Sequence, residues 1–120
     1  QPELSALSLD PIVDGTLDMA MANDLAVLAW SPLGGGRLLD PKSESEKAAV
    51  AALQAVAAAQ GVSLTAAAIS WIMAHPARAI PIIGSQDPAR IRAAGEALKV
   101  KWTRASWYTI YVASRGEPLP

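Results

Sequence analysis

Apolar residues form two strand-sized runs along the chain, and a glycine turn follows each run. The first is Leu25–Trp30, which is followed by Ser-Pro-Leu and then three consecutive glycines. The second is Ala79–Ile83, which is followed by Gly84. Both runs are short and rich in aliphatic residues, as is typical of buried strands. We therefore predict two strands here and a short, extended start at Gln1–Ser5.

Between and after these runs, apolar residues recur at helical spacing. The pattern predicts helices at residues 17–22, 47–60, 64–75, 88–98 and 104–114. Four of these helices have a predicted capping residue in front of them: Asp14 or Thr16, Ser43, Ser63 and Thr103. Ser43 and Glu46 have the spacing of a capping box, and Asp87-Pro88 predicts the start of the remaining helix. Asp10-Pro11 is predicted to be a turn.

The faces of these helices predict what is buried. In the helix at 88–98, Ile91, Ala94 and Leu98 share one face and are expected to be covered. Trp107, Ile110 and Tyr111 form the corresponding stripe of the last helix. Trp71 and Trp102 are also interpreted as packing residues.

Strands that alternate with helices predict a parallel sheet with right-handed crossovers. Both glycine turns would then lie at the carboxyl edge of the sheet. The first turn, Gly34–Gly36, is followed by Arg37. Glycine backbone N–H groups together with a guanidinium favour an anion site. The alternatives are a flexible surface loop and a solvated Arg37.

Composition narrows the class of protein. The chain has 120 residues, of which 52% are hydrophobic and 18% are charged, which suits one globular domain. A net charge of −1 without charge runs gives no reason to expect a nucleic-acid partner. The absence of cysteine excludes disulfides and cysteine metal sites, and we expect no metal. No signal peptide or membrane span is expected, so a cytoplasmic location is predicted.

Three motifs in register resemble the aldo-keto reductase family, and the likeness covers essentially the whole chain. Trp30–Gly34 (WSPLG) resembles the end of the seventh barrel strand, and Gly84–Ile91 (GSQDPARI) resembles the eighth strand and its helix. Gln1–Ser5 is similar to the end of the sixth strand. The tail from Leu98 is similar to a bacterial subgroup of oxidoreductases in this family. The resemblance implies the C-terminal portion of a (β/α)8 barrel over residues 1–120, about three parallel strands with flanking helices.

The resemblance also implies roles in binding NADPH. Gln1 matches the residue that binds the nicotinamide carboxamide, and Trp30 matches the aromatic residue that stacks on the nicotinamide ring. Ser31, Leu33 and Gly34 match the segment that lies along the pyrophosphate. Arg37 is a further candidate for contact with a phosphate, because it is a cation directly after the glycine turn. The match to the adenosine 2′-phosphate site comprises Ser85, Arg90 and the adjacent Gln86.

Two departures from the family pattern weaken parts of this match. Ala93 and Ala94 stand where the family often has a Glu-Asn pair near the adenine. Gly84 stands where many members have lysine, so a lower affinity for the 2′-phosphate is expected.

The family reduces an aldehyde or ketone with NADPH, using a tyrosine, lysine, aspartate and histidine from the first half of the barrel. No segment here matches those four residues, and Tyr108 and Tyr111 are predicted in the last helix, outside the barrel. We therefore expect the chain to be inactive alone, with the N-terminal half of the barrel as its missing partner. Unpaired strand edges predict a marginally stable or aggregating piece. The alternatives are a non-catalytic nicotinamide-nucleotide sensor and a structural fragment without a ligand.

Other candidate residues have structural interpretations. His75, the one histidine, is predicted to be structural at a helix end. Glu44 and Glu46 are interpreted as helix-start residues rather than an acid–base pair. For Glu3, the barrel floor and a buried ion pair both remain open.

Overall fold

Three parallel segments make up the sheet of this chain. The computed structural model describes residues 1–120, and in it β1 (Leu28–Ala29) pairs in parallel with β2 (Ile80–Pro81). A parallel bridge between Glu3 and Trp30 adds the N-terminal segment on the other side of β1. Trp30 N donates to Pro2 O at 3.0 Å, and Ile82 N donates to Ala29 O at 2.9 Å. The predicted parallel arrangement is therefore confirmed, with β1 in the middle.

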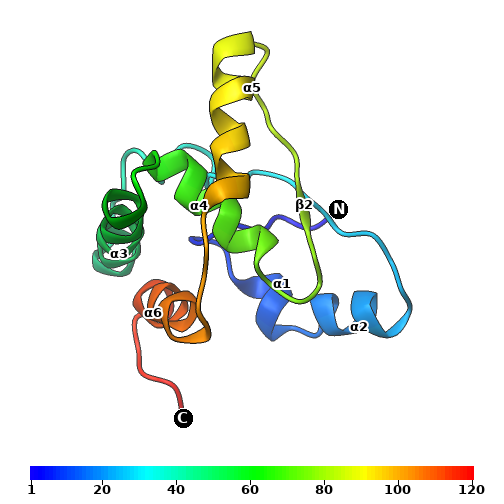
Figure 1. The fold of residues 1–120 in the computed structure, drawn as a ribbon. Helices are drawn as coiled ribbons and strands as arrows, with labels where there is room; N and C mark the ends of the chain where they lie inside the picture. The colour runs from blue at the N-terminus through cyan, green and yellow to red at the C-terminus, as the bar shows by residue number, and fades with distance from the viewer.

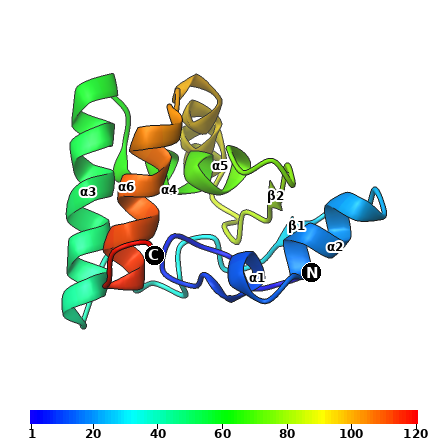
Figure 2. The same cartoon turned by 90° about the horizontal axis from the view of Figure 1, so that it is seen from below.

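Helices connect and flank these segments (Figure 1). The α-helices are α1 (Asp10–Val13), α2 (Thr16–Ala22), α3 (Glu44–Gln60), α4 (Leu64–Met73), α5 (Pro88–Ala94) and α6 (Arg104–Arg115). A 3-10 helix, Gly95–Lys99, continues from α5. Both views show α3 and α6 side by side, at a distance from α1 and α2 (Figures 1 and 2).

The core lies between one face of the sheet and the helices. Ala29 of β1 is buried, as are Val27 and Ala79 just before the two strands, and Trp71 and Ile72 from α4 are at most 1% exposed. The cluster is completed by Leu4, Ala6, Leu17, Ala20, Leu38, Val50, Leu53, Ala57, Ala67, Ala68, Ile110 and Tyr111. The predicted stripe of α6 is thus largely confirmed: Ile110 and Tyr111 are buried, and Trp107 packs against the cluster while partly exposed.

The opposite face of the sheet is open and apolar. Along β1 and β2 burial alternates, so that Trp30, Ile80 and Ile82 remain 44%, 52% and 39% exposed. Beyond β2, and beyond the N-terminal segment, the sheet has no further strand. Exposed apolar side chains on one face and unpaired strand edges are features of an arc of a barrel rather than of a closed one.

Several predicted boundaries were wrong. The runs Leu25–Trp30 and Ala79–Ile83 pair over shorter stretches than expected, because ladder hydrogen bonds form only where neighbouring segments are in register. Asp10-Pro11 begins α1 instead of a turn, since proline fits the first turn of a helix. Gly15, with φ of 90°, is the N-cap of α2, although Asp14 Oδ1 accepts from Thr16 N at 2.9 Å.

The predicted burial of the helix at 88–98 was also wrong. The segment forms α5 and then the 3-10 helix, with Ile91 48% and Leu98 78% exposed and Ala94 only partly buried. The helical spacing is present, but no element within residues 1–120 covers this face. Figure 1 shows α5 projecting away from the other helices. No single helix has the length and apolar composition of a membrane span; α3 and α4 together meet that test, but they are bent by 101°.

Candidate nucleotide site at the carboxyl edge

Both glycine turns lie at the same edge of the sheet. Since β1 and β2 are parallel, the segments that follow them, Ser31–Arg37 and Ser85–Arg90, both leave from the carboxyl edge. The structure therefore agrees with the prediction that both glycine turns lie at the carboxyl edge of the sheet. A ligand that spans the ends of neighbouring strands can contact both turns.

The first turn presents unpaired backbone N–H groups. Gly34, Gly35 and Gly36 have φ of 69°, 63° and 91°, so three successive residues are left-handed. Gly34 N donates to Ser31 O at 2.9 Å, whereas the N–H groups of Gly35 and Gly36 have no protein acceptor. Gly35 and Gly36 are also exposed. Free N–H groups on a turn with positive φ are suited to binding an anion.

Gly34 and Gly35 provide a matched test of this turn. An added Cβ at Gly34 would lie 3.2 Å from Leu7 Cδ1, whereas one at Gly35 would meet nothing within 4 Å. We expect Gly35→Ala to lower the free energy of unfolding by about 1 kcal/mol through backbone strain alone, and Gly34→Ala to lower it further. Urea unfolding followed by circular dichroism measures both. Equal losses would contradict the tight contact at Gly34.

Trp30 and Gln1 are brought together at the start of this edge. The Trp30 indole Nε1 donates to the Gln1 backbone oxygen at 3.0 Å, and the ring is 44% exposed. Ser31, the next residue, has φ of 49°, which is uncommon for a residue other than glycine. The two residues assigned to the nicotinamide are thus neighbours, and Trp30 offers ring surface for stacking.

The second turn has a similar supply of donors. Ser85 Oγ accepts from Asp87 N at 3.1 Å, and the Asp87 side chain accepts from Ala89 N at 3.0 Å. The backbone N–H groups of Ser85 and Gln86 have no protein acceptor. Arg90 has a side chain 80% exposed and a 3.9 Å contact to Asp87, which leaves its guanidinium accessible. Gln86 is exposed beside it.

Arg37 is held by protein groups. Its Nε donates to Gly34 O at 2.9 Å, its Nη1 pairs with Glu46 Oε2 at 2.8 Å and its Nη2 donates to Ser8 Oγ at 2.8 Å. Arg37 is thus not simply solvated; direct phosphate contact stays a prediction. The contacts of Arg37 with Ser8 and Glu46 were not predicted from the sequence. The capping-box spacing marked Glu46, but only as a helix start.

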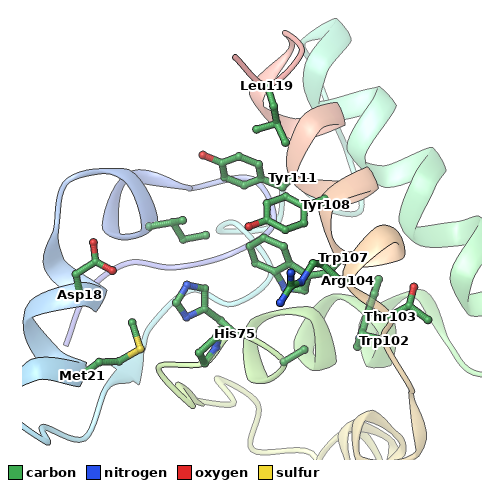
Figure 3. A pocket seen from close by; sticks show the side chains of 13 residues that line it. Asp18, Met21, His75, Trp102, Thr103, Arg104, Trp107, Tyr108, Tyr111 and Leu119 are labelled. Atoms are coloured by element: carbon green, nitrogen blue, oxygen red, sulfur yellow. The ribbon is translucent and has the colours of Figure 1, made fainter.

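A second concavity lies away from this edge. A cleft of about 700 Å³ is bordered by the end of α4, α6 and the first two helices. Figure 3 shows Trp107, Tyr108 and Tyr111 on one side and Asp18 and Met21 on the other. Burial lowers the pKa of His75, against an opposing effect of Asp18, so that the imidazole is neutral near pH 7. His75 Nδ1 accepts from Ala77 N at 3.0 Å, in agreement with a structural role.

The architecture is that of part of a (β/α)8 barrel, and comparison with known proteins identifies the family. The model of the Aldo/keto reductase family matches residues 1–113, and the chain belongs to this family. The predicted fold class, the C-terminal portion of such a barrel, is confirmed.

Curated relatives are similar over the whole chain. A 6-dehydroglucose reductase from Novosphingobium aromaticivorans is 58% identical over 120 residues, all of this chain and 40% of the relative. A protein of the same name from Agrobacterium fabrum is 38% identical over 119 residues, 99% of this chain and 39% of the relative. The chain therefore spans about two fifths of the length of these relatives.

Solved structures share the fold at lower identity. A thermostable aldo-keto reductase solved with the inhibitor epalrestat superposes with a TM-score of 0.76 at 19% identity, over 92% of this chain and 38% of that one. An aldose reductase from Giardia lamblia gives a TM-score of 0.73 at 24% identity, over 98% and 37% of the two chains. These likenesses support the barrel fold. The roles assigned to individual site residues remain predictions.

Proposed function

We propose that this chain is the NADPH-binding part of an enzyme that reduces an aldehyde or ketone to an alcohol. The observation that carries the proposal is the meeting of two donor-rich turns and an exposed tryptophan at one edge of parallel strands. Membership of the Aldo/keto reductase family supports oxidoreductase chemistry. Two relatives are named for 6-dehydroglucose, which makes it the first carbonyl substrate to test.

The residues present fit a phosphorylated dinucleotide. Gln1 and Trp30 would hold the nicotinamide, because they touch each other and leave an indole face accessible. Ser31, Leu33 and the N–H groups of the glycine turn would lie along the pyrophosphate. The bound cofactor would supply a hydride to the carbonyl carbon. The protein groups at this edge bind and orient it; the acid that protonates the oxygen is not among them.

The second turn would determine the choice between NADPH and NADH. Ser85 and Arg90 would bind the 2′-phosphate, since an accessible guanidinium and a hydroxyl suit a dianion. Gln86 lies beside the same group. Removal of one charge-assisted contact is expected to weaken NADPH binding about tenfold in Arg90→Ala and to leave NADH binding unchanged. Titration followed by nucleotide fluorescence measures both affinities.

Arg92→Ala is the matched control for this experiment. Arg92 lies on the same short helix, is also exposed and carries the same charge, but is not assigned to the phosphate. If Arg92→Ala lowers NADPH affinity as much as Arg90→Ala, the effect is a general loss of positive charge. If neither nucleotide binds the unaltered chain, the proposed function fails.

We further propose that the open face of the sheet is covered by the rest of a barrel. Ile80 and Ile82 on the open face and Ile91 and Leu98 on α5 and the 3-10 helix are all exposed in this chain. The relatives are about two and a half times as long, which supports an N-terminal half that completes the arc. In this assignment the three segments are strands six to eight, and the catalytic tyrosine comes from the other half.

A further inference from the structure

Three segments of the carboxyl edge meet at the Arg37 guanidinium. One is the turn itself, through Gly34 O at 2.9 Å, and another is the loop after the N-terminal segment, through Ser8 Oγ at 2.8 Å. The third is the start of α3, through Glu46 Oε2 at 2.8 Å. The guanidinium therefore cross-links the turn, the loop at Ser8 and the start of α3.

Glu46 is itself firmly placed. Its Oε1 accepts from Lys42 N at 3.0 Å and from Ser43 N at 3.3 Å, which completes the capping box of α3. Those backbone donors, with Arg37 in addition, hold the pKa of Glu46 below its usual range. The Glu46 side chain is 15% exposed and that of Arg37 is 41% exposed. The carboxylate that binds Arg37 is therefore fixed in position by backbone hydrogen bonds.

The Arg37 contacts determine the shape of the glycine turn. Its Nε bonds the carbonyl of Gly34, the residue at which the turn enters the left-handed region. The same carbonyl accepts from Arg37 N at 3.2 Å, and Leu38 N donates to Leu33 O at 3.3 Å. The N–H groups of Gly35 and Gly36, two exposed residues of this closed turn, have no protein acceptor. A flexible triple-glycine turn would otherwise lose considerable conformational entropy on binding a ligand.

We propose that Arg37, Glu46 and Ser8 form a clamp that holds the Gly34–Gly36 turn in its anion-binding shape. Arg37 is a positioning residue of this site, and its charge is balanced by Glu46 rather than by the ligand. The proposal rests on the proposed nucleotide site, because the value of the clamp lies in presenting the turn to a phosphate. The clamp and direct binding of phosphate by Arg37 predict opposite effects of Glu46→Gln: the clamp predicts weaker NADPH binding, and direct binding predicts tighter NADPH binding.

Glu46→Gln tests the proposal. A glutamine keeps an oxygen for the N–H groups of Lys42 and Ser43, so the cap of α3 is retained. The side chain at position 46 becomes neutral, so the ion pair with Arg37 is lost and the guanidinium keeps only its contacts to Gly34 O and Ser8 Oγ. We expect about fivefold weaker NADPH binding, as for loss of a partly exposed charge-assisted bond. Amide hydrogen exchange at Arg37, Leu38 and Leu39 should become faster, because these N–H groups close the turn.

Glu44→Gln is the matched control. Glu44 is in the same first turn of α3 and has a side chain 96% exposed, with only a 3.7 Å contact to Lys47. The same loss of charge at this position should change neither NADPH affinity nor exchange in the turn.

The outcomes separate the alternatives. Tighter NADPH binding by Glu46→Gln would show that a freed Arg37 binds phosphate, and would overturn the clamp. Unchanged affinity with unchanged exchange would overturn it as well. If the unaltered chain binds no NADPH, the proposed function fails, and the exchange measurement still decides whether Glu46 holds the turn through Arg37.

Discussion

Replacing Trp71 by alanine is expected to lower the free energy of unfolding by about 3–5 kcal/mol, a large fraction of the roughly 5–15 kcal/mol that stabilises a typical domain. The Trp71 side chain is completely buried in α4 and stacks on Trp107 of α6 at a centroid distance of 4.5 Å. Each indole also donates to the backbone oxygen of the other residue at 3.0 Å. The substitution removes the largest buried side chain and leaves the Trp107 oxygen without its donor.

Trp30→Ala serves as the comparison for this experiment. Trp30 is 44% exposed and its one side-chain hydrogen bond is to Gln1 O, so its removal should cost about 1 kcal/mol or less. Urea unfolding followed by circular dichroism measures both variants. Trp30→Ala should instead weaken NADPH binding. Comparable losses of stability in the two variants would contradict the assignment of Trp71 to the core and Trp30 to the site.

Helix starts could be predicted from the sequence because their causes are local. Ser43, Ser63 and Thr103 each accept a hydrogen bond from a backbone N–H three residues later, as their spacing predicted. Asp87 caps α5 in the same manner, through Ala89 N. A side chain and a backbone group a few residues apart meet whatever the rest of the chain does.

Strand lengths and the burial of α5 could not be predicted in this way. The length of β1 depends on register with Ile80 and Pro81, some fifty residues away along the chain. Ile91 and Leu98 have the spacing of a buried face, yet spacing does not reveal whether a covering element is present. Periodicity predicts which side of a helix is apolar; tertiary context decides what touches it.

In the candidate site, too, local features could be predicted from the sequence, whereas contacts between distant residues could not. The left-handed turn at Gly34–Gly36 follows from glycine chemistry, and the shared edge follows from parallel strands. The partners of Arg37 do not, because Ser8 lies 29 residues away and Glu46 already had a local explanation as a cap. Because the capping role of Glu46 was evident from the sequence, its second role as a partner of Arg37 was not predicted.

The purified 120-residue chain is expected to bind NADPH but not to oxidise it in the presence of 6-dehydroglucose or another aldehyde. Carbonyl reduction needs a proton donor beside the nicotinamide, and the proposed nicotinamide residues are at the carboxyl edge. Tyr108 and Tyr111 are in α6 and border the cleft with His75, which precedes β2 at its amino end. No tyrosine or histidine of this chain lies in the turns at the carboxyl edge. The rate of NADPH absorbance loss measures this directly.

A chimera supplies the positive control for that negative result. The relative from Novosphingobium aromaticivorans aligns with all 120 residues at 58% identity, so this chain can replace the aligned segment and be joined to the remaining residues of that relative. If those residues carry the catalytic tyrosine and complete the barrel, the chimera should oxidise NADPH with 6-dehydroglucose, and Trp30→Ala should impair it. Turnover by the 120-residue chain alone would contradict the division of binding and catalysis between two parts of a barrel. A chimera that folds and binds NADPH but shows no turnover would contradict the assignment of the catalytic residues to the other part of the barrel.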